Sequence, residues 1–420
     1  MINERVLLVG VQTKETDNQF NYSMEELQQL TETAGGEVVK IVTQKRNTID
    51  SRTVVGKGKL NEIENWVDAF EVDLIIFNQG LSGRHVRNIQ DVIEIKIIDR
   101  IQLILDIFSS RASTKEGGLQ VELAQQEYLL PRLTGQYENL SRLGAGIGTR
   151  GPGETKLEAD RRHILDRIAD IKGELRKVDE HRKRNRERRM ESNVFQIGLV
   201  GYTNAGKSTL LNELTEADAV ERDALFATLT TTTRKMQLPD GIQATLTDTV
   251  GFIQDLPTQL IESFQSTLEE TRNMDLILHV IDGSSDQLEI QEDTVIQLLE
   301  DMEMDEIPRI TVYNKKDLIE GPFSPNIYPN LFISAKNSDD IETLRDYIVQ
   351  AMKKVMVPYI YDFKAEEGDN LAHIQQETIV SDLSFDDEDN SYRVEGFAKE
   401  SSRWNPKFHL KDQKTKEDWE

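Results

Sequence analysis

Residues 201–208 read GYTNAGKS, two glycines followed directly by a lysine and a serine. The segment follows the strand-like VFQIGLV and precedes the helical STLLNELT. Glycines let backbone N–H groups turn toward phosphate oxygens, and the helix N-terminus adds partial positive charge. The pattern predicts a phosphate-binding loop in which Lys207 reaches the β- and γ-phosphates and the Ser208 hydroxyl binds Mg²⁺. The residues expected to line the nucleotide here are Gly201, Tyr202, Asn204, Ala205, Gly206, Lys207, Ser208 and Thr209.

Two later segments, NKKD (314–317) and SAK (334–336), indicate which base is bound. Each follows a predicted strand, which places it at the carboxyl edge of a sheet, where ligands bind. The Asp317 carboxylate can accept two hydrogen bonds from guanine N1–H and the exocyclic amine, whereas adenine would leave the charge unpaired. The sequence therefore predicts GTP and GDP as ligands. The residues expected around the base are Asn314 as a loop brace, Lys315 as a cover, Asp317, Ser334, Ala335 through its N–H, and Lys336.

The segment TDTVGFIQDLP, residues 247–257, has the D-x-x-G spacing of a loop that senses Mg²⁺ and the terminal phosphate, with Asp248 and Gly251 at the two ends. A second switch segment is expected between this loop and the phosphate loop. LFATLTTTTRK, residues 225–235, offers several threonines, one of which must meet Mg²⁺. Chemistry alone does not select the threonine, and a solvent-facing Thr-rich strand is the alternative. The reaction expected is attack of water on the γ-phosphate.

Phe252 occupies a position at which Ras-type GTPases have a glutamine that orients the attacking water. A phenyl ring has no hydrogen-bonding group, so another residue, the backbone or a partner must position the water. Slow intrinsic turnover is expected, because the electrostatic contribution of Lys207 and Mg²⁺ remains while water orientation is lost. Gln254 is an alternative in cis, two residues further along. The basic run 181–189 is another candidate source of charge at the nucleotide, although a solvated helix end is the favoured explanation.

Composition restricts the classes of protein. The chain has 420 residues, enough for two to four domains, with 37% hydrophobic residues. There are no cysteines, which excludes disulfides, thiolate metal sites and cysteine nucleophiles, and the six histidines lack metal-ligand spacing. No apolar run approaches a membrane span and the first residues do not resemble a signal peptide, so a cytoplasmic protein without membrane insertion is expected.

Charge is unevenly distributed along the chain. The formal net charge of −25 opposes unspecific binding of nucleic acid by the whole molecule. Residues 132–189 nevertheless carry roughly six more basic than acidic side chains, and residues 358–420 roughly eight more acidic than basic ones. One region could therefore still meet a polyanion, while solvated helix faces and an acidic tail are the simpler alternative.

Hydrophobic patterning predicts an α/β multidomain fold. In the first region, short apolar runs alternate with helical stretches such as MEELQQLTETAG and KLNEIENWVDAF, which is the rhythm of βαβ units and a mostly parallel sheet. The expected buried strands there are 5–11, 36–43, 72–78 and 93–99. In the second α/β region, they are 194–200, 276–282, 308–314 and 330–336.

Between these regions, helical patterns over 116–140 and 156–189 flank a glycine-dense segment, LGAGIGTRGPGE, at 143–154. Such a pattern is typical of a helical hairpin with a flexible loop. The predicted domains are an N-terminal α/β domain (1–115), a helical hairpin linker (116–192), a Ras-like P-loop GTPase domain (193–357) and a small acidic α+β domain with a disordered tail (358–420).

Taken together, these segments resemble the HflX family, within the Obg–HflX group of translation-factor-class GTPases. The resemblance rests on LQVELAQQEYLLPRL, LSRLGAGIGTRGPGETKLEADRR, the phosphate loop, LFATLTTTTR and DTVGFIQDLP. It implies that Thr228 is the Mg²⁺-sensing threonine, so that Ser208, Thr228 and Asp248 form the metal site and Lys207, Thr228 and Gly251 the catalytic centre. Ala145 departs from the family pattern, in which a second glycine is expected.

The resemblance also implies a function. Members bind the large ribosomal subunit, split stalled or idle 70S ribosomes and hydrolyse GTP under ribosomal stimulation. The Gly-rich loop reaches the peptidyl-transferase centre, and here Arg142 and Arg150 are suited to ribosomal RNA phosphates, as are the basic linker helices. A role in a stress response is expected, and nothing in the sequence demands more than a monomer.

Two alternatives come from other classes of function. One is a GTP-dependent regulatory switch that acts on a protein partner. The other is an ATP-driven nucleic-acid remodeller with a second nucleotide site at VVGKGK, residues 54–59. That segment lacks the spacing of a phosphate loop followed by Ser or Thr, which favours a turn that begins a helix.

Overall fold

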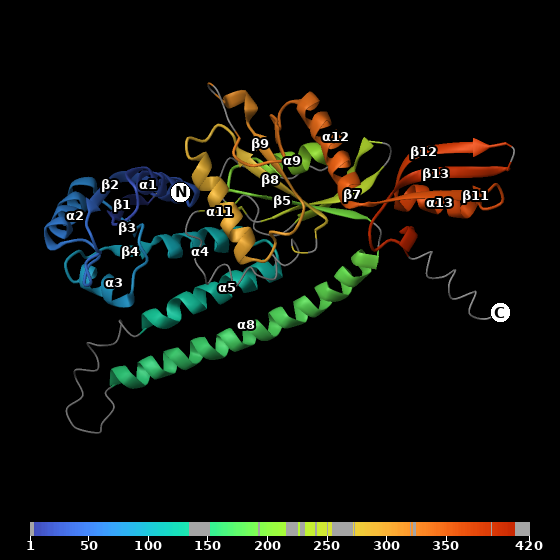
Figure 1. The fold of residues 1–420 in the computed structure, drawn as a ribbon. Helices are drawn as coiled ribbons and strands as arrows, with labels where there is room; N and C mark the ends of the chain where they lie inside the picture. Colours follow the sequence, from blue (N-terminus) through green and yellow to red (C-terminus); the bar gives the residue numbers. More distant parts are fainter. Residues whose placement is uncertain are drawn as a thin grey trace. The chain divides into compact units, whose positions relative to one another are not determined.

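The computed structural model describes residues 4–133, 152–191, 194–215, 226, 232–239, 242–249, 251–253, 272, 274–319, 321, 325–387 and 389–407, without side chains at 152–156, 179 and 181–191 (Figure 1). By backbone contacts, these residues form two compact units. The first contains the described residues up to Glu180 together with Phe226 and Ile253, and the second contains the remainder. The predicted division into four domains is a finer one and remains a prediction.

The N-terminal part contains a four-stranded, fully parallel sheet in the order β2-β1-β3-β4, as the βαβ rhythm predicts. Its strands are β1 (Arg5–Gln12), β2 (Glu37–Lys45), β3 (Leu74–Phe77) and β4 (Lys96–Asp99). Its helices are α1 (Asp17–Thr33), α2 (Lys57–Phe70), α3 (Gly83–Gln90) and α4 (Arg100–Arg111). Side chains from α2 and α3 share a hydrophobic core with one face of the sheet, while α1 packs against β1 and α4.

In this N-terminal part, the structure corrects one sequence prediction and decides between two alternatives for another segment. The strand at 36–43 is not fully buried as predicted, because β2 is an edge strand and only Val42 is buried among its residues. The VVGKGK segment is a turn that begins a helix, since Gly56 is the N-cap residue of α2. Its backbone N–H binds Gln44 Oε1 at 2.9 Å.

The linker forms the expected pair of long helices, α5 (Lys115–Leu129) and α8 (Pro152–Glu191), with a short 3₁₀ turn, η1 (Leu130–Arg132), after α5 (Figure 1). The pair is held by an apolar cluster that includes Leu123 and Ile168, and by a two-pronged ion pair from Arg167 to Glu122 at 2.6 and 2.7 Å. α8 begins four residues earlier than predicted, because Pro152 fits the first position of a helix, where no N–H is needed. Most of the Gly-rich segment, 143–151, lies outside the described residues.

The second unit contains a six-stranded sheet in the order β10-β9-β8-β5-β7-β6, parallel except for β6. Its strands are β5 (Phe195–Gly201), β6 (Thr232–Gln237), β7 (Gln243–Asp248), β8 (Leu276–Asp282), β9 (Arg309–Asn314) and β10 (Asn330–Phe332). Four of these match predicted strands. β10 is half-buried rather than buried because it lies at an edge, and β6 bears out the alternative interpretation of a Thr-rich strand for residues 232–235.

In the described part of this unit, three helices accompany the sheet: α9 (Lys207–Leu214), α11 (Leu288–Asp301) and α12 (Ser338–Val355). Leu210 of α9 and Leu344 of α12 belong to the same hydrophobic core as Leu199 and Val280 of the strands. A buried hydrogen bond of 2.7 Å joins Tyr313 of β9 to Glu292 of α11. The carboxyl ends of five parallel strands therefore meet at one edge, which is where the predicted nucleotide segments lie.

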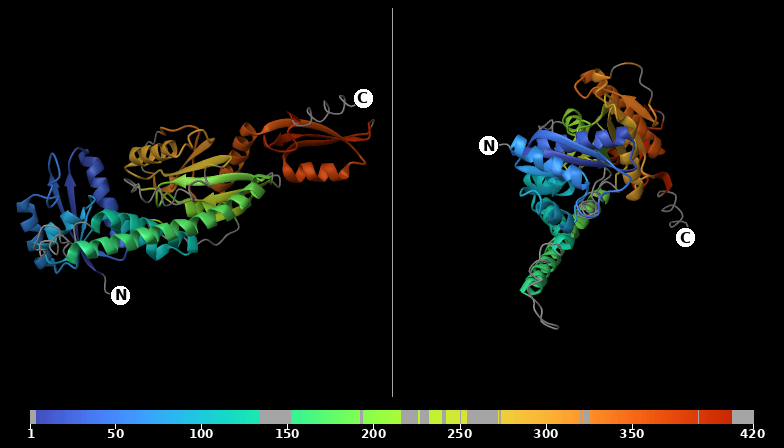
Figure 2. Two further views of the ribbon diagram at one scale, coloured as in Figure 1. Left: turned by 90° about the horizontal axis from the view of Figure 1, so that it is seen from below. Right: turned by 90° about the vertical axis from the view of Figure 1, so that its left-hand side faces the viewer.

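After Val355 the chain forms a small antiparallel sheet, β11 (Val357–Lys364), β13 (Ser391–Ala398) and β12 (Ile379–Asp386) in that order, with helix α13 (Gly368–Glu377) along one face (Figure 2). This confirms a β-containing C-terminal domain. Residues 408–420, where a disordered tail is predicted, lie outside the described residues. Within the described part of the chain, no helix is both long and apolar enough to cross a membrane.

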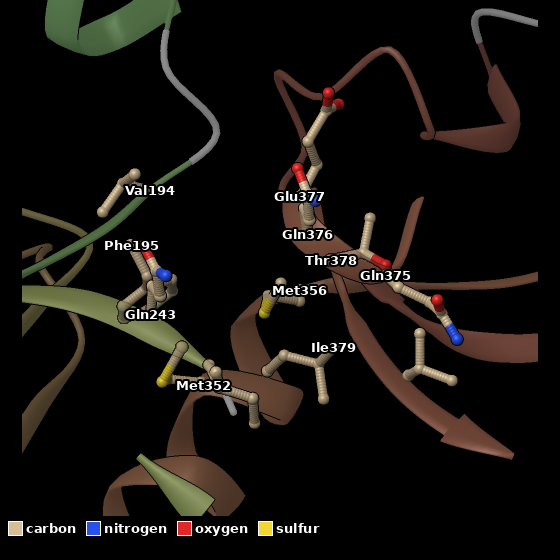
Figure 3. A pocket seen from close by; sticks show the side chains of 12 residues that line it. Val194, Phe195, Gln243, Met352, Met356, Gln375, Gln376, Glu377, Thr378 and Ile379 are labelled. Atoms are coloured by element: carbon tan, nitrogen blue, oxygen red, sulfur yellow. The ribbon is translucent and has the colours of Figure 1, made fainter. Parts of the chain in front are cut away.

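A cavity of about 320 Å³ lies where this small sheet follows the six-stranded one (Figure 3). Met352, Met356 and Ile379 supply apolar surface to it, while Gln375 and Glu377 supply polar surface. None of its lining residues belongs to the predicted nucleotide loops. Beside it, an ion pair of 2.8 Å between Lys399 and Asp275 ties the end of β13 to the segment before β8.

Candidate functional site

The phosphate loop leaves the end of β5 and enters α9, as its sequence predicts. Gly206 has a φ of 95°, a conformation that L side chains rarely adopt, and a Cβ there would lie 2.2 Å from the side-chain nitrogen of Asn314. Ala205 and Lys207 are buried, whereas Asn204 is exposed. The backbone path therefore requires glycine at 206.

Lys207 is held inside this loop. Its ammonium group donates to the backbone oxygens of Gly201 at 3.0 Å and Tyr202 at 2.8 Å. Burial lowers the pKa of Lys207 to about 8, and the negative charge of Asp248 opposes that shift. The Lys207 charge is thus available below about pH 8 at the place where phosphate oxygens are expected.

Ser208 and Asp248 meet across α9 and β7. The Ser208 hydroxyl donates to Asp248 Oδ2 at 3.0 Å, and the Asp248 side chain is fully buried. A hydroxyl and a carboxylate are the hard oxygen donors that Mg²⁺ prefers. These residues fit the metal implied by the sequence. Among the described residues, no cluster of three or more histidines or acidic residues could hold a metal ion alone.

The D-x-x-G loop is tied to the phosphate loop through the backbone of Phe252. Its N–H donates to Gly201 O at 3.2 Å, its carbonyl accepts from Thr203 N at 2.7 Å, and its side chain is 2% exposed. Gly251 lies so close that a Cβ would approach Thr203 and Lys207 to about 3 Å. The structure therefore gives Phe252 a packing role that the sequence did not reveal.

Of the Thr-rich switch segment, Thr228 lies outside the described residues, and so does Gln254. Phe226, two residues before Thr228, is fully buried with a φ of 56°. Its ring meets that of Phe108 in α4 edge-on, with ring centroids 4.5 Å apart. A bulky residue in this left-handed conformation is uncommon, so the packing of Phe226 outweighs its backbone cost.

The two base-recognition segments are joined to each other and to the phosphate loop by Asn314. Its side-chain amide donates to Ala205 O at 2.9 Å, and its Oδ1 accepts from Ala335 N at 2.9 Å. Asp317 is exposed, and a hydrogen bond from the Ser334 side chain lowers its pKa. Asp317 is thus an available carboxylate acceptor at neutral pH.

Two acidic residues that the sequence motifs do not include also hold these loops. Asp282, at the end of β8, forms an ion pair of 2.7 Å with Lys315. Asp340, in the first turn of α12, accepts from Ser334 N at 2.8 Å and from Lys316 Nζ at 3.2 Å. A carboxylate at the end of an apolar strand, as in LILHVID, is a signal that could have identified Asp282. No local signal identifies Asp340.

All three family models that match the chain describe GTPases. The model of the GTP-binding GTPase N-terminal region matches residues 21–109, that of the middle region matches 111–189, and that of the 50S ribosome-binding GTPase matches 196–315. The GTPase HflX of Alkalihalophilus pseudofirmus is 50% identical over 400 residues, which cover 95% of each chain. The chain belongs to the HflX family of GTPases. The family resemblance inferred from the sequence is thereby confirmed, and GTP and GDP are the nucleotides of this chain.

A second HflX relative agrees with this assignment. The GTPase HflX of Escherichia coli K12 is 40% identical over 352 residues, 82% of either chain. A crystal structure of a GTP-binding protein from Sulfolobus solfataricus in complex with GDP is 25% identical and covers 84% of this chain and 99% of that chain, with a TM-score of 0.44. Mg²⁺ is typical of this family of HflX GTPases.

Proposed function

We propose that this HflX-family GTPase binds the large ribosomal subunit, splits stalled or idle 70S ribosomes, and hydrolyses GTP under stimulation by the ribosome. The observation that carries the stimulated step is the burial of Phe252 beside the phosphate loop. A buried phenyl ring cannot orient water, so the residue after Gly251 contributes structure instead of chemistry. A docked partner then provides the orientation of the attacking water that residue 252 cannot provide.

In the proposed reaction, Lys207 stabilises charge on the β- and γ-phosphates and Gly251 allows its loop to approach the γ-phosphate. Ser208 and Asp248, with Thr228 from the switch segment, hold Mg²⁺, which neutralises charge on the phosphates when bound. Asn314 and Ala335 fix the base loop, Lys315 covers the base, and Asp317 accepts from guanine. Loss of the γ-phosphate releases the two switch segments.

Ribosome binding is supported by the match of residues 196–315 to the 50S ribosome-binding GTPase model and by the basic excess in the linker. In the proposed complex, residues 143–154 and the basic helices contact ribosomal RNA. The protein acts as a monomer in the cytoplasm. A GTP-dependent switch that acts on a non-ribosomal protein is the competing function.

The deciding experiment measures GTP hydrolysis by the full chain with and without purified large subunits at fixed salt. A rise of at least about tenfold, which corresponds to roughly 1.4 kcal/mol, is expected for an active site completed by the ribosome. Light scattering of 70S ribosomes then reports splitting in the presence of GTP. An unchanged rate together with tight GTP binding would favour the competing function.

A further inference from the structure

The sheet of the C-terminal domain has one open edge. Among the described strands, β12 pairs only with β13, and all six residues from Ser381 to Asp386 are exposed. In an antiparallel edge strand, alternate backbone N–H and C=O groups point away from the sheet and can pair with another strand. This edge is therefore a surface on which a further strand can be added.

The two faces of β12 differ in chemistry. Leu383 and Phe385, which are 41% and 44% exposed, lie opposite Val394 and Tyr392 of β13, and the rings of Phe385 and Tyr392 are 4.7 Å apart. The alternate residues Asp382, Ser384 and Asp386 point to the other face. Figure 2 shows these strands extending from the end of the domain that carries α12. A strand paired with β12 would meet apolar side chains on one face. On the other face it would meet the carboxylates of Asp382 and Asp386, with Arg393 of β13 opposite Ser384.

The opposite edge of the sheet is less suited to such pairing. β11 contains Pro358, which has no N–H to donate. Its Tyr361 hydroxyl already donates to Trp404 O at 3.1 Å, and its Lys364 would repel a basic partner. Of the two described edges, β12 carries the carboxylates of Asp382 and Asp386 and no basic residue of its own, whereas β11 carries Pro358 and Lys364.

We propose that β12 is the docking edge for a strand of a partner protein in which basic and apolar residues alternate. Paired residues of neighbouring strands share a face. The partner's apolar residues then cover Leu383 and Phe385, while its lysines or arginines lie beside Asp382 and Asp386.

Charge selects this occupant over the others. In residues 358–420, acidic side chains outnumber basic ones by roughly two to one, which repels RNA phosphates. A second copy of the same strand would place Asp382 or Asp386 near like charges. A basic protein segment is attracted by the same carboxylates. The natural partner in this proposal is a lysine-rich protein of the large subunit. This part of the inference rests on the proposed ribosome binding.

The direct test uses a fluorescent decapeptide of alternating lysine and valine as the probe and the full chain as the receptor, with anisotropy measured at fixed salt. Saturable binding is expected. It should weaken at least about tenfold in the Asp382→Lys/Asp386→Lys variant and in the Leu383→Ser/Phe385→Ser variant. Because all four side chains are exposed, the variants should fold, which circular dichroism verifies.

The matched control reverses two exposed carboxylates in the first unit, Glu64→Lys/Asp68→Lys on α2, and should change affinity less than twofold. A decapeptide with five lysines followed by five valines should bind more weakly than the alternating one. Equal affinity for both peptides, or equal losses in the control and β12 variants, would mean unspecific attraction and overturn the proposal.

A second arm measures co-sedimentation of the same proteins with large ribosomal subunits. Weaker sedimentation of the two β12 variants supports docking on the ribosome. Peptide binding that depends on β12, without sedimentation of the unmodified chain, would refute the proposed ribosome function and leave the docking edge standing. Failure of the peptide to bind overturns the docking edge whatever the ribosome result.

Discussion

The side-chain amide of Asn314 donates to the backbone carbonyl of Ala205 at 2.9 Å, which joins the base-recognition loop to the phosphate loop. Both residues are buried, so the bond is shielded from water. The same side chain accepts from Ala335, and one amide therefore sets the distance between three loops. Changes that affect base recognition should consequently affect phosphate binding as well.

Replacing Asn314 with alanine should weaken GDP and GTP binding together by about 10- to 100-fold, because each buried group left without its partner costs about 1–3 kcal/mol. Binding of a fluorescent GDP analogue measures this. Asn330→Ala is the matched control, since Asn330 begins the edge strand β10 and its side chain donates to Ile327 O outside the nucleotide loops. An unchanged affinity in the Asn314 variant would contradict the role of the bridge.

Asp340→Ala should weaken guanine nucleotide binding by about tenfold, because Ser334 N and Lys316 both lose their acceptor. The neighbouring Asp339→Ala variant is the control, since Asp339 is exposed in the same first turn of α12. Calorimetric titration with GDP distinguishes them. Equal losses in the two variants would point to a charge effect at the helix N-terminus instead of loop positioning.

Nucleotide affinity should depend on pH through Lys207. The pKa of this lysine is lowered to about 8, whereas triphosphate binding raises it again by favouring the ammonium form. The complex then binds more protons than the free protein, so GTP affinity should be constant below about pH 7.5 and fall by up to about tenfold per pH unit above pH 8. Lys207→Arg, which does not titrate there, should remove the slope. A flat profile for the unmodified chain would contradict the shift.

Phe252→Gln should not accelerate intrinsic hydrolysis, because position 252 faces the interior beside the phosphate loop. Single-turnover rates should stay within about threefold of the unmodified chain, while burial of a polar amide lowers the free energy of unfolding by about 1–3 kcal/mol. Phe252→Leu is the packing control. Its hydrolysis rate and its free energy of unfolding should stay closer to those of the unmodified chain than the values of the Gln variant do. A tenfold faster Gln variant would show that this side chain reaches the attacking water.

In the N-terminal domain, Arg100 of α4 forms an ion pair with Glu26 of α1, and both side chains are at most 5% exposed. Arg100→Met should destabilise this domain by about 3–5 kcal/mol, because it leaves a carboxylate buried without its charge partner. Hydrogen exchange in α1 and α4 measures the loss.

The double variant Arg100→Met/Glu26→Leu should recover most of that stability, since both charges are then absent. Lys45→Met, which breaks the exposed pair with Asp17, should leave the stability of the domain nearly unchanged. Similar losses for the buried and the exposed pair would contradict the argument from burial.

Much of this molecule could be predicted from its sequence because the decisive features are local. The phosphate loop needs glycine at 206 and a lysine at the start of a helix, and both are contiguous in the chain. NKKD and SAK each follow an apolar strand, so their position at the carboxyl edge comes from the rule of parallel sheets. Thr228 and most of the Gly-rich segment remain predictions, since they lie outside the described residues.

The tertiary structure alone decided what depends on partners distant in the chain. The packing of Phe252 against the phosphate loop joins residues about 50 positions apart, and Asp340 reaches Lys316 from another element. The edge positions of β2 and β12 follow from strand order, which no apolar run encodes by itself. A motif specifies the conformation of its own residues, whereas burial, edges and bridging hydrogen bonds arise only when separate elements pack together.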